Sequence, residues 1–597
     1  MPNDLLEDLI AASKQELERL AEPRNRPRYF MFGATDACAE GGMHTIRFAN
    51  VPHVVSDAAA SSHMRTELDL FRVGDVFGVP GSMRVPDCGG VEITFDGDGL
   101  AATGLDGHAV LRAAEQGIDF IMDSRDFVCN TLEALLELRG TPTPLLEAMV
   151  EERAAHKMTR MCASDNPSNL NASQASAIAR ASQQAVTFVW GPPGTGKTTT
   201  LGELAARLVH AGKRVLLTGL SGAATDQLLS QAVRRLPAVE LSHQVTKTSV
   251  ARVGRTRNAE CMPYAREAFQ SQSFGALRAA TGWQNHVRGA SLVAATFAGV
   301  GYHGLRRGED GRIGLGRFDY VIADEVSMAS IPQLASLCLF SPSAIALGGD
   351  PMQLPPIFPE DAEQPNRWFS ESIFEVAAVT DRHDPRVAFL DTQYRMNRQI
   401  GDLVSYLFYD CELRSATEDT RSVECFQAPC IFVHCEGPSE FQPQAVDDQT
   451  RRFNSTHALA VARVVARAIA HGLSPEDIAV IAPYNAQVVR IRETLMSLVP
   501  SALAGDEHTR VATVHSFQGQ EKRMVIVDFT DDDVMPSPLT ARRELINVAL
   551  SRAKEQLVLV GNRNYLVNPA YLPEDARMMF GEILHWVSAN TLEWSKL

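Results

Sequence analysis

The chain has 597 residues, of which 45% are hydrophobic and 21% are charged. This length is too great for a single hydrophobic core and predicts three or four domains of an ordinary globular protein. A formal net charge of −16 argues against a protein that coats nucleic acid non-specifically, because its field repels phosphate, but it allows a narrow local site.

No targeting or metal pattern stands out. The start, MPNDLLEDLI, lacks the basic and then apolar pattern of a secretory signal, and no stretch is apolar enough to span a bilayer, which favours an intracellular, cytoplasmic location. The ten cysteines form no paired framework, so free thiols are expected. Cys425, Cys430, His434 and Cys435 lie close together, but their spacing fits no zinc pattern, and PCIFVHC is more typical of a strand.

Residues 1–160 carry no catalytic signature and predict an accessory domain. Leu6, Leu9, Ile10, Leu17 and Leu20 form a helical stripe that ends near Pro23, and the spacing of Asp4 and Glu7 is typical of a helix cap. From about 27 to 128, short apolar runs such as MHTIRFANV and VEITF alternate with Gly, Asp and Pro, which predicts a small β-barrel. Helical patterns return at NTLEALLEL and at TPLLEAMVEERAAHKM, where Pro144 stands in a first turn. An unrelated partner-binding domain is the alternative.

Residues 185–209, AVTFVWGPPGTGKTTTLGELAARLV, predict a strand, a glycine-rich turn and an amphipathic helix. Gly191, Gly194 and Gly196 let backbone N–H groups converge on phosphate oxygens, and the helix directs its positive end to the same place. Lys197 would supply a charge to the β- and γ-phosphates, and Thr198 a hydroxyl to Mg²⁺. The segment therefore predicts a nucleotide site, which also includes Pro192, Pro193, Thr195 and Thr199.

Two later strands end in polar residues that suit the same site. FDYVIADEVSM (318–328) runs into Asp324 and Glu325, and the carboxyl ends of parallel strands meet at one edge of a sheet. Asp324 would belong to the Mg²⁺ shell, and Glu325 would orient the attacking water. AIALGGDPMQLPPI (344–357) ends in Gln353, which could sense loss of the γ-phosphate. The alternative for the acidic pair is a solvated strand end.

Eight segments now stand in one order: NASQASAI, GPPGTGKT, DEVSM, GDPMQLPP, QYRM, APYNAQ, TVHSFQGQEK and INVALSRAK. From about 165 to 565 the chain resembles superfamily 1 helicases of branch B, the branch with the nonsense-mediated-decay helicase, senataxin and the immunoglobulin-mu-binding helicase. The resemblance implies an α/β fold with two tandem RecA-like parallel-sheet motor domains after an accessory domain of stalk helices and a β-barrel. We therefore expect the accessory domain at 1–160, motor domain 1 at 161–390 with a helical insertion near 227–290, and motor domain 2 at 391–597.

The resemblance also implies nucleotide-binding roles that no local pattern assigns. Gln174 would read the adenine edge, Tyr394 would stack on the adenine face and Glu521 would contact the ribose. Arg395 and Arg552 would both reach the γ-phosphate, where a guanidinium can be worth about 10³–10⁵ in rate. Because motor domain 2 would supply both arginines, hydrolysis would depend on closure of the two domains, and Gln353 would couple it to motion.

By the same resemblance, a set of turn residues would contact the nucleic-acid backbone: Ser221, Thr296, Pro483, Tyr484, Thr513 and Ser516. Such contacts go to phosphate and sugar and carry little sequence information. Each of these residue types is also typical of a turn or a helix cap.

The chain departs from the family pattern at two positions. Gly222 stands where the family often has asparagine, and His457, in RRFNSTHALA, stands where it usually has glutamate, although Asn454 is kept. His457 could be a solvated helix residue, and unwinding would be weak if stepping needs the missing carboxylate. The most basic loops, RVGRTR (252–257) and GLRRGEDGRIGLGR (304–317), are either solvated turns or linings of a nucleic-acid channel.

The sequence thus predicts a monomeric, Mg²⁺-ATP-driven helicase or translocase on single-stranded DNA or RNA, moving 5′ to 3′. The motifs do not separate DNA from RNA, because contacts to the backbone do not report the 2′-hydroxyl. A nucleic-acid-activated ATPase that displaces proteins without unwinding is the second hypothesis, and an ATP switch that gates a protein partner is the third. Protein partners would bind through the N-terminal domain, and no membrane association is expected.

Overall fold

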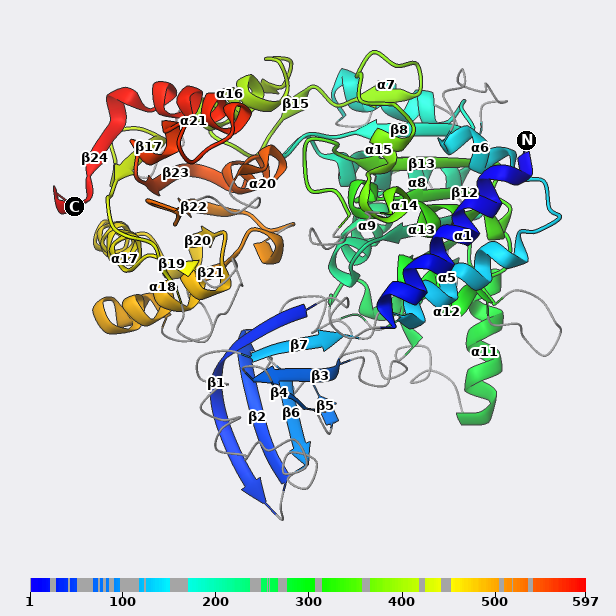
Figure 1. Ribbon diagram of the computed structural model, residues 1–597. Coiled ribbons are helices and arrows are strands. Elements are labelled where there is room, and N and C mark those ends of the chain that lie inside the picture. Colours follow the sequence, from blue (N-terminus) through cyan, green and yellow to red (C-terminus); the bar gives the residue numbers. More distant parts are fainter. Residues whose placement is uncertain are drawn as a thin grey trace. The chain divides into compact units, whose positions relative to one another are not determined.

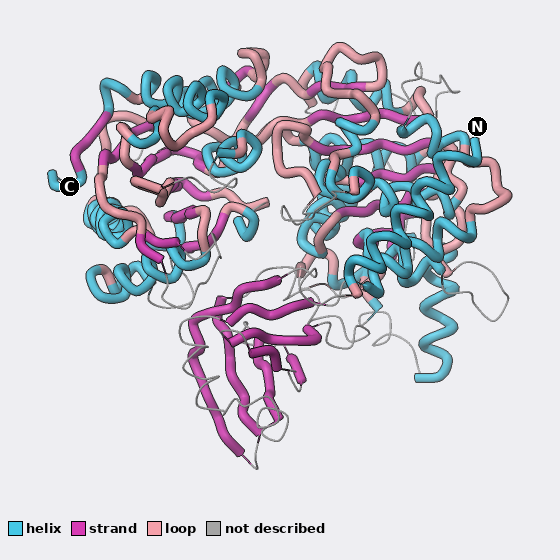
Figure 2. Tube along the Cα trace, viewed as in Figure 1, coloured by secondary structure: helices cyan, strands magenta, loops and turns pink. Residues whose placement is uncertain are grey.

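The structure is a computed structural model that divides into two compact units (Figures 1 and 2). Unit 1 comprises Met1–Gly191, Gly196–Pro351 and Pro355–Leu390, and unit 2 comprises Pro192–Thr195, Met352–Leu354 and Asp391–Leu597. The structure describes residues 2–21, 28–40, 43–50, 68–73, 76–78, 82–84, 91–96, 118–122, 125–150, 161, 170–236, 249–254, 256, 258–266, 276–305, 314–356, 366–417, 425–441, 452–503, 509–517, 519–534 and 541–596.

A parallel sheet of seven strands forms the centre of unit 1, in the order β10-β11-β9-β12-β13-β8-β14. Figure 1 labels β12, β13 and β8 of this sheet. Its strands are almost wholly apolar because helices cover both faces of such a sheet; every residue of β9 is buried. The strands are β8 (Val186–Trp190), β9 (Val215–Gly219), β10 (Val250–Arg252), β11 (Leu292–Thr296), β12 (Tyr320–Ala323), β13 (Ala344–Gly349) and β14 (Val387–Phe389).

Helices between these strands close the core. α8 packs Leu201, Leu204 and Leu208 into one buried cluster with the sheet, and the hydroxyl of Tyr320 in β12 donates to the Ala181 carbonyl at the end of α7 (2.7 Å). The helices are α7 (Ala172–Ala181), α8 (Lys197–His210), α9 (Gly222–Arg235), α11 (Ala276–Gly289), α12 (Phe297–Leu305), α13 (Ile331–Ser336), α14 (Arg367–Ser370) and α15 (Ile373–Val376).

Segment 227–290 is less purely helical than expected. It holds the rest of α9 and all of α11, but also β10, which pairs in parallel with β11 through Val250 and Leu292. The short strand VAR was missed because three residues give too short a period to read. The segment therefore extends the central sheet by an edge strand.

The N-terminal region of unit 1 begins with α1 (Pro2–Leu20), which packs against α5 (Arg125–Glu137) and touches α6 (Pro144–Val150). The predicted stripe faces inward: Leu6, Leu9, Ile10 and Leu20 are buried and Leu17 is half-buried. The predicted cap at Asp4 lies outside the described side chains. α6 begins at Pro144, as predicted, because the missing N–H of proline costs nothing in a first turn.

In the sequence between α1 and α5, where we expected a small β-barrel, the described strands form an antiparallel sheet in the order β4-β3-β7-β1-β2-β6-β5. β1 pairs with β7 through Arg28–Met31 and with β2 further on, and its register shifts between Ala34 and Asp36, which bends a strand. Among the described strands, β4 and β5 stand at the two ends of the order. The strands are β1 (Arg28–Glu40), β2 (Met43–Asn50), β3 (Leu68–Val73), β4 (Val76–Gly78), β5 (Ser82–Arg84), β6 (Val91–Asp96) and β7 (Ile118–Met122).

Unit 2 has its own parallel sheet of six strands, in the order β21-β20-β22-β23-β17-β24. These are β17 (Cys430–His434), β20 (Ile478–Ala482), β21 (Arg510–Thr513), β22 (Lys522–Asp528), β23 (Ala553–Gly561) and β24 (Thr591–Glu593). Its helices are α16 (Arg398–Phe408), α17 (Ser455–Ala470), α18 (Asn485–Leu498), α20 (Arg543–Leu550) and α21 (Glu574–Trp586). Two short pairs complete it, β15 (Thr392–Gln393) with β16 (Arg414–Ser415) and β18 (Glu440–Phe441) with β19 (Arg452–Phe453).

Two parallel-sheet units confirm the predicted α/β class with tandem RecA-like domains. The limits 1–160, 161–390 and 391–597 stay predictions. The segment PCIFVHC forms β17, as its pattern predicted, and burial raises the pKa of the Cys430 and Cys435 thiols to about 12. In the part of the chain that is described, no helix has both the length and the apolar character to cross a bilayer.

Candidate active site and nucleic-acid contacts

The phosphate loop joins β8 to α8. Gly194 (φ 76°) and Gly196 (φ 75°) adopt left-handed backbone conformations that residues with a Cβ rarely take. A Cβ on Gly191 would come within 2.6 Å of the Cβ of Lys197, so this position also needs glycine. α8 begins at Lys197 and therefore presents its N-terminal N–H groups to the loop.

The first strand-end carboxylate lies directly against this loop within unit 1. Lys197 Nζ lies 2.7 Å from Asp324 Oδ1, and Thr198 Oγ1 donates to Asp324 Oδ2 (2.7 Å). Burial would lower the pKa of Lys197, but the charges of Asp324, Glu325 and Asp350 outweigh it and raise that pKa. A hydroxyl and a carboxylate are oxygen donors of the kind that Mg²⁺ prefers, so the two residues fit such an ion.

Glu325 follows Asp324 in a strained backbone. Its φ of 59° is left-handed, a conformation that costs a non-glycine residue about 1–3 kcal/mol and that clusters at functional sites. Its N–H donates to Asp324 Oδ1 (2.8 Å), which holds the turn, and its side chain is half-buried. Such strain is consistent with a catalytic role for the Glu325 carboxylate. The orientation of the attacking water by this carboxylate stays a prediction.

Trp190, which the sequence did not single out, ties two strand ends together. Its Nε1–H at the end of β8 donates to Oδ1 of the buried Asp350, which follows β13 (3.0 Å). Asp350 also contributes to the raised pKa of Lys197. In the sequence, Gly349 and Asp350 after an apolar strand were the one visible sign of a polar strand end. No local pattern connects Asp350 with a tryptophan 160 positions away.

Gln174 adjoins the phosphate loop from α7. It is buried, and its Oε1 accepts from the N–H of Asn171 (3.1 Å) while its own N–H donates to Asn171 Oδ1 (2.8 Å), which makes a capping box. A Cβ on Gly196 would lie 2.8 Å from Gln174 Nε2. The adenine-reading role stays a prediction, and the amide stands beside the glycine-rich loop.

In unit 2, Tyr394 follows β15 and has 46% of its surface exposed. Its N–H donates to the Gly194 carbonyl (2.8 Å), both residues being grouped in unit 2. The N–H of Arg395 donates to Gln393 Oε1 (2.9 Å), and Gln393 is fully buried. An exposed ring on an anchored backbone suits the expected stacking on adenine.

Arg395 is held by an ion-pair triad that the sequence did not predict. Its Nε lies 2.5 Å from Glu521 Oε2, and Lys554 Nζ lies 2.7 Å from Glu521 Oε1. Burial would raise the pKa of Glu521, but the charges of Arg395 and Lys554 outweigh it and lower that pKa. Glu521, which we expected at the ribose, therefore holds the arginine here. Lys554 was visible in the motif SRAK, but its partner was not.

Arg552 is buried, with 3% of its surface exposed. Its Nη2 donates to Gln353 Oε1 (3.2 Å) and its Nε to the Val548 carbonyl (3.2 Å), so two residues expected at the γ-phosphate contact each other within unit 2. Asn547, which the sequence did not single out, donates to the Met352 carbonyl (2.7 Å) and so holds the residue before Gln353.

The candidate nucleic-acid residues of unit 1 act as caps in this structure. Ser221 is the N-cap of α9, and its Oγ accepts from the N–H of Ala224 (3.1 Å). Thr296 ends β11, and its Oγ1 accepts from the N–H of Gly299 (3.0 Å). Gly222 is the first residue of α9. A cap and a phosphate contact are compatible at a helix N-terminus, so the nucleic-acid role stays a prediction.

In unit 2, Tyr484 is fully buried and its hydroxyl donates to Asp531 Oδ2 (2.6 Å). It is the N-cap of α18, and the half-buried Pro483 precedes it. Thr513 ends β21 and is half-buried, whereas the Ser516 side chain lies outside the described residues. Tyr484 therefore points inward. Contact with a nucleic-acid strand would have to come from the residues next to Tyr484 in the turn.

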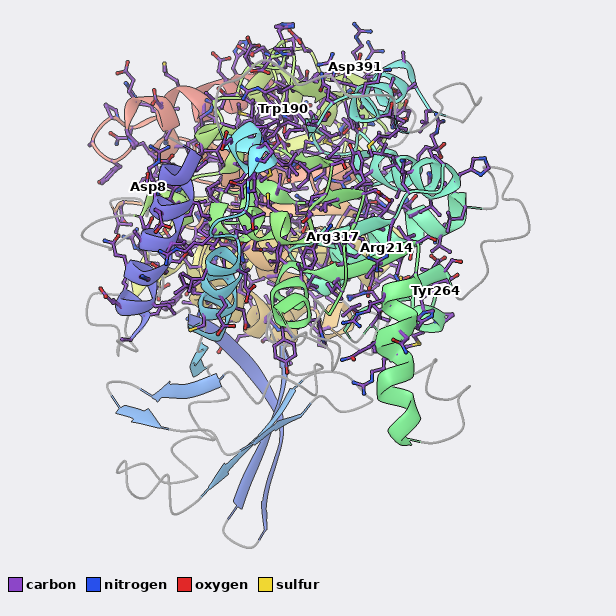
Figure 3. All side chains as sticks on the ribbon, turned by 90° about the vertical axis from the view of Figure 1, so that its right-hand side faces the viewer. Asp8, Trp190, Arg214, Tyr264, Arg317 and Asp391 are labelled. Atoms are coloured by element: carbon purple, nitrogen blue, oxygen red, sulfur yellow. The ribbon has the colours of Figure 1, made fainter. Side chains whose placement is uncertain are left out.

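The described arginines of the two basic loops differ in burial. Arg252 is 1% exposed, and its Nε lies 2.6 Å from Asp226 Oδ1 in α9, while Arg255 and Arg257 lie outside the described residues. Arg214 holds the end of the second loop, donating to the carbonyls of Leu315 (2.9 Å) and Arg317. Figure 3 labels Arg214 and Arg317. Burial lowers the pKa of Arg214 to about 10. The prediction of a solvated turn is therefore wrong at Arg252. At the described end of the second loop Arg317 is exposed, and residues 306–313 lie outside the described part of the chain.

His457 is not a solvated helix residue, and that interpretation is wrong. Its exposed fraction is 0%, and its Nδ1 lies 2.9 Å from Asp528 Oδ1 on β22. The helix pattern gave no sign of this partner because Asp528 lies 71 positions away in the sequence.

Two family models, each described as an AAA domain, match residues 169–281 and 369–564. The chain is 29% identical to the DNA polymerase alpha-associated DNA helicase A of Schizosaccharomyces pombe, over 66% of this chain and 64% of that protein. It is 28% identical to the regulator of nonsense transcripts 1 homolog of Drosophila melanogaster (67% and 35%) and 26% identical to the DNA replication ATP-dependent helicase/nuclease DNA2 of Saccharomyces cerevisiae (76% and 30%). The chain thus spans less than two thirds of each relative. It belongs to the superfamily 1 helicases, in the branch of the regulator of nonsense transcripts 1.

Proposed function

We propose that the chain is an Mg²⁺-ATP-driven helicase or translocase that moves 5′ to 3′ on single-stranded nucleic acid. The observation that carries the proposal is the contact of Lys197 and Thr198 with Asp324, because it brings a phosphate-loop cation, a hydroxyl and a strand-end carboxylate together. Family membership supports it, as does the helicase activity named for the relatives.

In the proposed reaction, Lys197 binds the β- and γ-phosphates, and Thr198 and Asp324 hold Mg²⁺, which would neutralise phosphate charge. Glu325 orients the water for in-line attack. Arg395 and Arg552 stabilise the charge that develops on the γ-phosphoryl oxygens. Since Glu521 and Gln353 contact these arginines in the structure, each arginine must exchange its present partner for phosphate during turnover.

ATP turnover measured without polymer, with single-stranded DNA and with single-stranded RNA tests the proposal. Stimulation by a polymer, together with displacement of a strand from a duplex with a 5′ overhang but not a 3′ overhang, is the expected result. Lys197→Ala removes the phosphate-binding charge and should abolish turnover in every condition. Turnover that is indifferent to both polymers would contradict the proposal and favour an ATP switch that gates a protein partner.

A second candidate keeps the ATPase and omits unwinding. The replacement of the family's glutamate by His457 motivates it. A change near the candidate nucleic-acid contacts of unit 2 can weaken movement along the nucleic acid without altering the phosphate loop. This remodeller would show polymer-stimulated turnover and displacement of a bound protein from single strands, with no displacement of a complementary strand. Comparing the two displacement assays on the same preparation separates the candidates.

We propose further that the chain acts as a monomer and that residues 1–160 bind protein partners. Sedimentation of the full chain with a single-stranded oligonucleotide tests the first point, and a dimer on one oligonucleotide would contradict it.

A further inference from the structure

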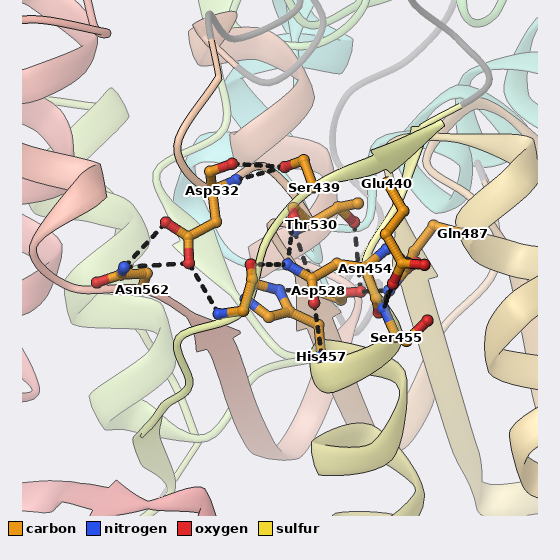
Figure 4. A network of polar contacts seen from close by, with 11 residues as sticks. Ser439, Glu440, Asn454, Ser455, His457, Gln487, Asp528, Thr530, Asp532 and Asn562 are labelled. Atoms are coloured by element: carbon orange, nitrogen blue, oxygen red, sulfur yellow. Dashed lines mark hydrogen bonds and ion pairs between the residues drawn. The ribbon is translucent and has the colours of Figure 1, made fainter. Parts of the chain in front are cut away.

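A network of buried polar groups surrounds the end of β22, and the proposed ATP chemistry does not use it (Figure 4). Asp528 is 1% exposed. Its Oδ1 lies 2.9 Å from His457 Nδ1 and accepts from the N–H of Thr530 (3.0 Å), and its Oδ2 accepts from Gln487 Nε2 (2.5 Å). A buried carboxylate is costly unless such donors satisfy it, so the three contacts depend on one another.

The network joins the beginnings of two helices to the end of a strand. His457 lies in the first turn of α17 and Gln487 in the first turn of α18, and both are fully buried. Asn454 caps α17: its Oδ1 accepts from the N–H of His457 (3.0 Å), and its own N–H donates to Gln487 Oε1 (2.8 Å). Asp528 therefore sets the position of α18 relative to α17 and β22.

The segment 528–531 also holds the turn that precedes α18. Tyr484 donates to Asp531 Oδ2 (2.6 Å), and Arg452 Nη1 lies 3.2 Å from Asp531 Oδ1. The Pro483–Tyr484 turn is thus held at two points: by Asp531 through Tyr484, and by Asp528 through Gln487. Small displacements of Asp528 would move this turn.

We propose that His457, Asp528 and Gln487 are positioning residues that orient the Pro483–Tyr484 turn for single-stranded nucleic acid. The carboxylate that the family usually carries at the position of His457 is supplied here from β22, by Asp528. The inference rests on the proposed function, because it assumes that this turn lies on the nucleic-acid path. It assigns the network to polymer affinity and not to ATP chemistry.

The charge arrangement allows a reciprocal test. His457→Glu would set two carboxylates against each other in a fully buried site, where like charges disfavour the charged forms. Asp528→Asn would turn an amide N–H₂ toward one of the donors that the carboxylate now satisfies. In the double variant, the asparagine N–H₂ can donate to the carboxylate introduced on α17 while its oxygen accepts from Gln487. This rebuilds the pair with the carboxylate on the helix, and only the N–H of Thr530, which now donates to Asp528 Oδ1, loses its acceptor.

The experiment measures the concentration of single-stranded oligonucleotide that gives half-maximal stimulation of ATP turnover, and basal turnover without polymer, on the full chain. We expect H457E and D528N each to raise the half-saturating concentration about tenfold or more, since each leaves a buried donor or charge unsatisfied. Basal turnover should stay close to that of the wild type. The double variant H457E/D528N should bind the oligonucleotide more tightly than either single variant, with recovery kept partial by the unsatisfied N–H of Thr530.

A matched control lies on β23. Gln556 is fully buried and its Nε2 donates to the Ala428 carbonyl (2.9 Å), outside the network. Q556M should lower the melting temperature without moving the half-saturating concentration. If H457E does not fold, H457Q keeps an N–H donor for Asp528 and should show a smaller rise in the same concentration.

The outcomes separate the two proposals. A wild-type chain whose turnover neither polymer stimulates would overturn the proposed function. A stimulated wild type with folded H457E, H457Q or D528N variants that keep its half-saturating concentration would overturn only the positioning role. Loss of basal turnover in a folded variant, or no recovery in the double variant, would also overturn it.

Discussion

Arg395 and Arg552 have the same expected target but different surroundings. The side chain of Arg395 is 18% exposed and is held by the Glu521 carboxylate, whereas Arg552 is 3% exposed and contacts the neutral amide of Gln353. A guanidinium held by a charge must break a stronger contact before it reaches phosphate than one held by an amide. The two arginines should therefore contribute at different stages of closure.

Replacing either arginine should slow ATP hydrolysis more than it weakens ATP binding. We expect Arg395→Ala and Arg552→Ala each to reduce turnover by about 10³-fold, because the lost charge acts mainly in the transition state. Nucleotide affinity, followed with a fluorescent ATP analogue, should change by less than about tenfold, or about 1.4 kcal/mol. Arg398→Ala is the matched control, since its exposed side chain pairs only weakly with Asp402 (3.6 Å). Normal turnover in either arginine variant would show that the replaced arginine does not act at the γ-phosphate.

The triad of Arg395, Glu521 and Lys554 predicts a dependence of stability on pH. The pKa of Glu521 is lowered from its usual value of 4.5, so the pair contributes stability above that value and loses it as the pH falls through the folded-state pKa. Lys554→Met removes one of the charges that lower this pKa. Chemical denaturation should show the variant less stable than the wild type at pH 7, and the difference should shrink below about pH 4. An equal difference at both pH values would contradict this.

Individual elements depend on buried partners that join them. α9 and β10 are joined by Asp226 and Arg252, whose side chains are 8% and 2% exposed. The sequence suggested a solvated basic loop here, but the arginine closes the edge of the central sheet. Breaking a buried pair leaves an uncompensated charge, whereas replacing both partners with apolar groups removes the need for either.

The effects of single and double replacements of this pair should therefore not add. Asp226→Leu and Arg252→Met should each reduce the free energy of unfolding by about 3–5 kcal/mol. The double variant should be more stable than either single variant. Urea denaturation of the three proteins checks this, and strictly additive losses would show that the two side chains do not interact.

For the whole molecule, the net charge of −16 coexists with a proposed nucleic-acid path. Several arginines that raised the local positive charge in the sequence are engaged inside the units, Arg214, Arg252 and Arg552 among them. Binding of a polyanion must then rely on hydroxyls, backbone N–H groups and a few cations at turns, and it should weaken steeply with salt only if cations dominate.

Closure of the two units should be visible in solution. We expect a non-hydrolysable ATP analogue with Mg²⁺ and an oligonucleotide to decrease the radius of gyration measured by small-angle X-ray scattering, because arginines of unit 2 would bind a phosphate held by unit 1. Lys197→Ala should remove the decrease. A radius that stays constant in the wild type would argue against closure as the trigger of hydrolysis.

The amino-acid sequence was sufficient to predict two parallel sheets, the phosphate loop and the meeting of Lys197 and Thr198 with Asp324. Glycine geometry and helix start are set within a few residues, and parallel strands bring their carboxyl ends to one edge whatever their separation. Three other features required the folded chain: Glu521 holds Arg395, Tyr484 points inward and His457 pairs with Asp528. Burial and choice of partner depend on side chains distant in the chain, and no local period records them.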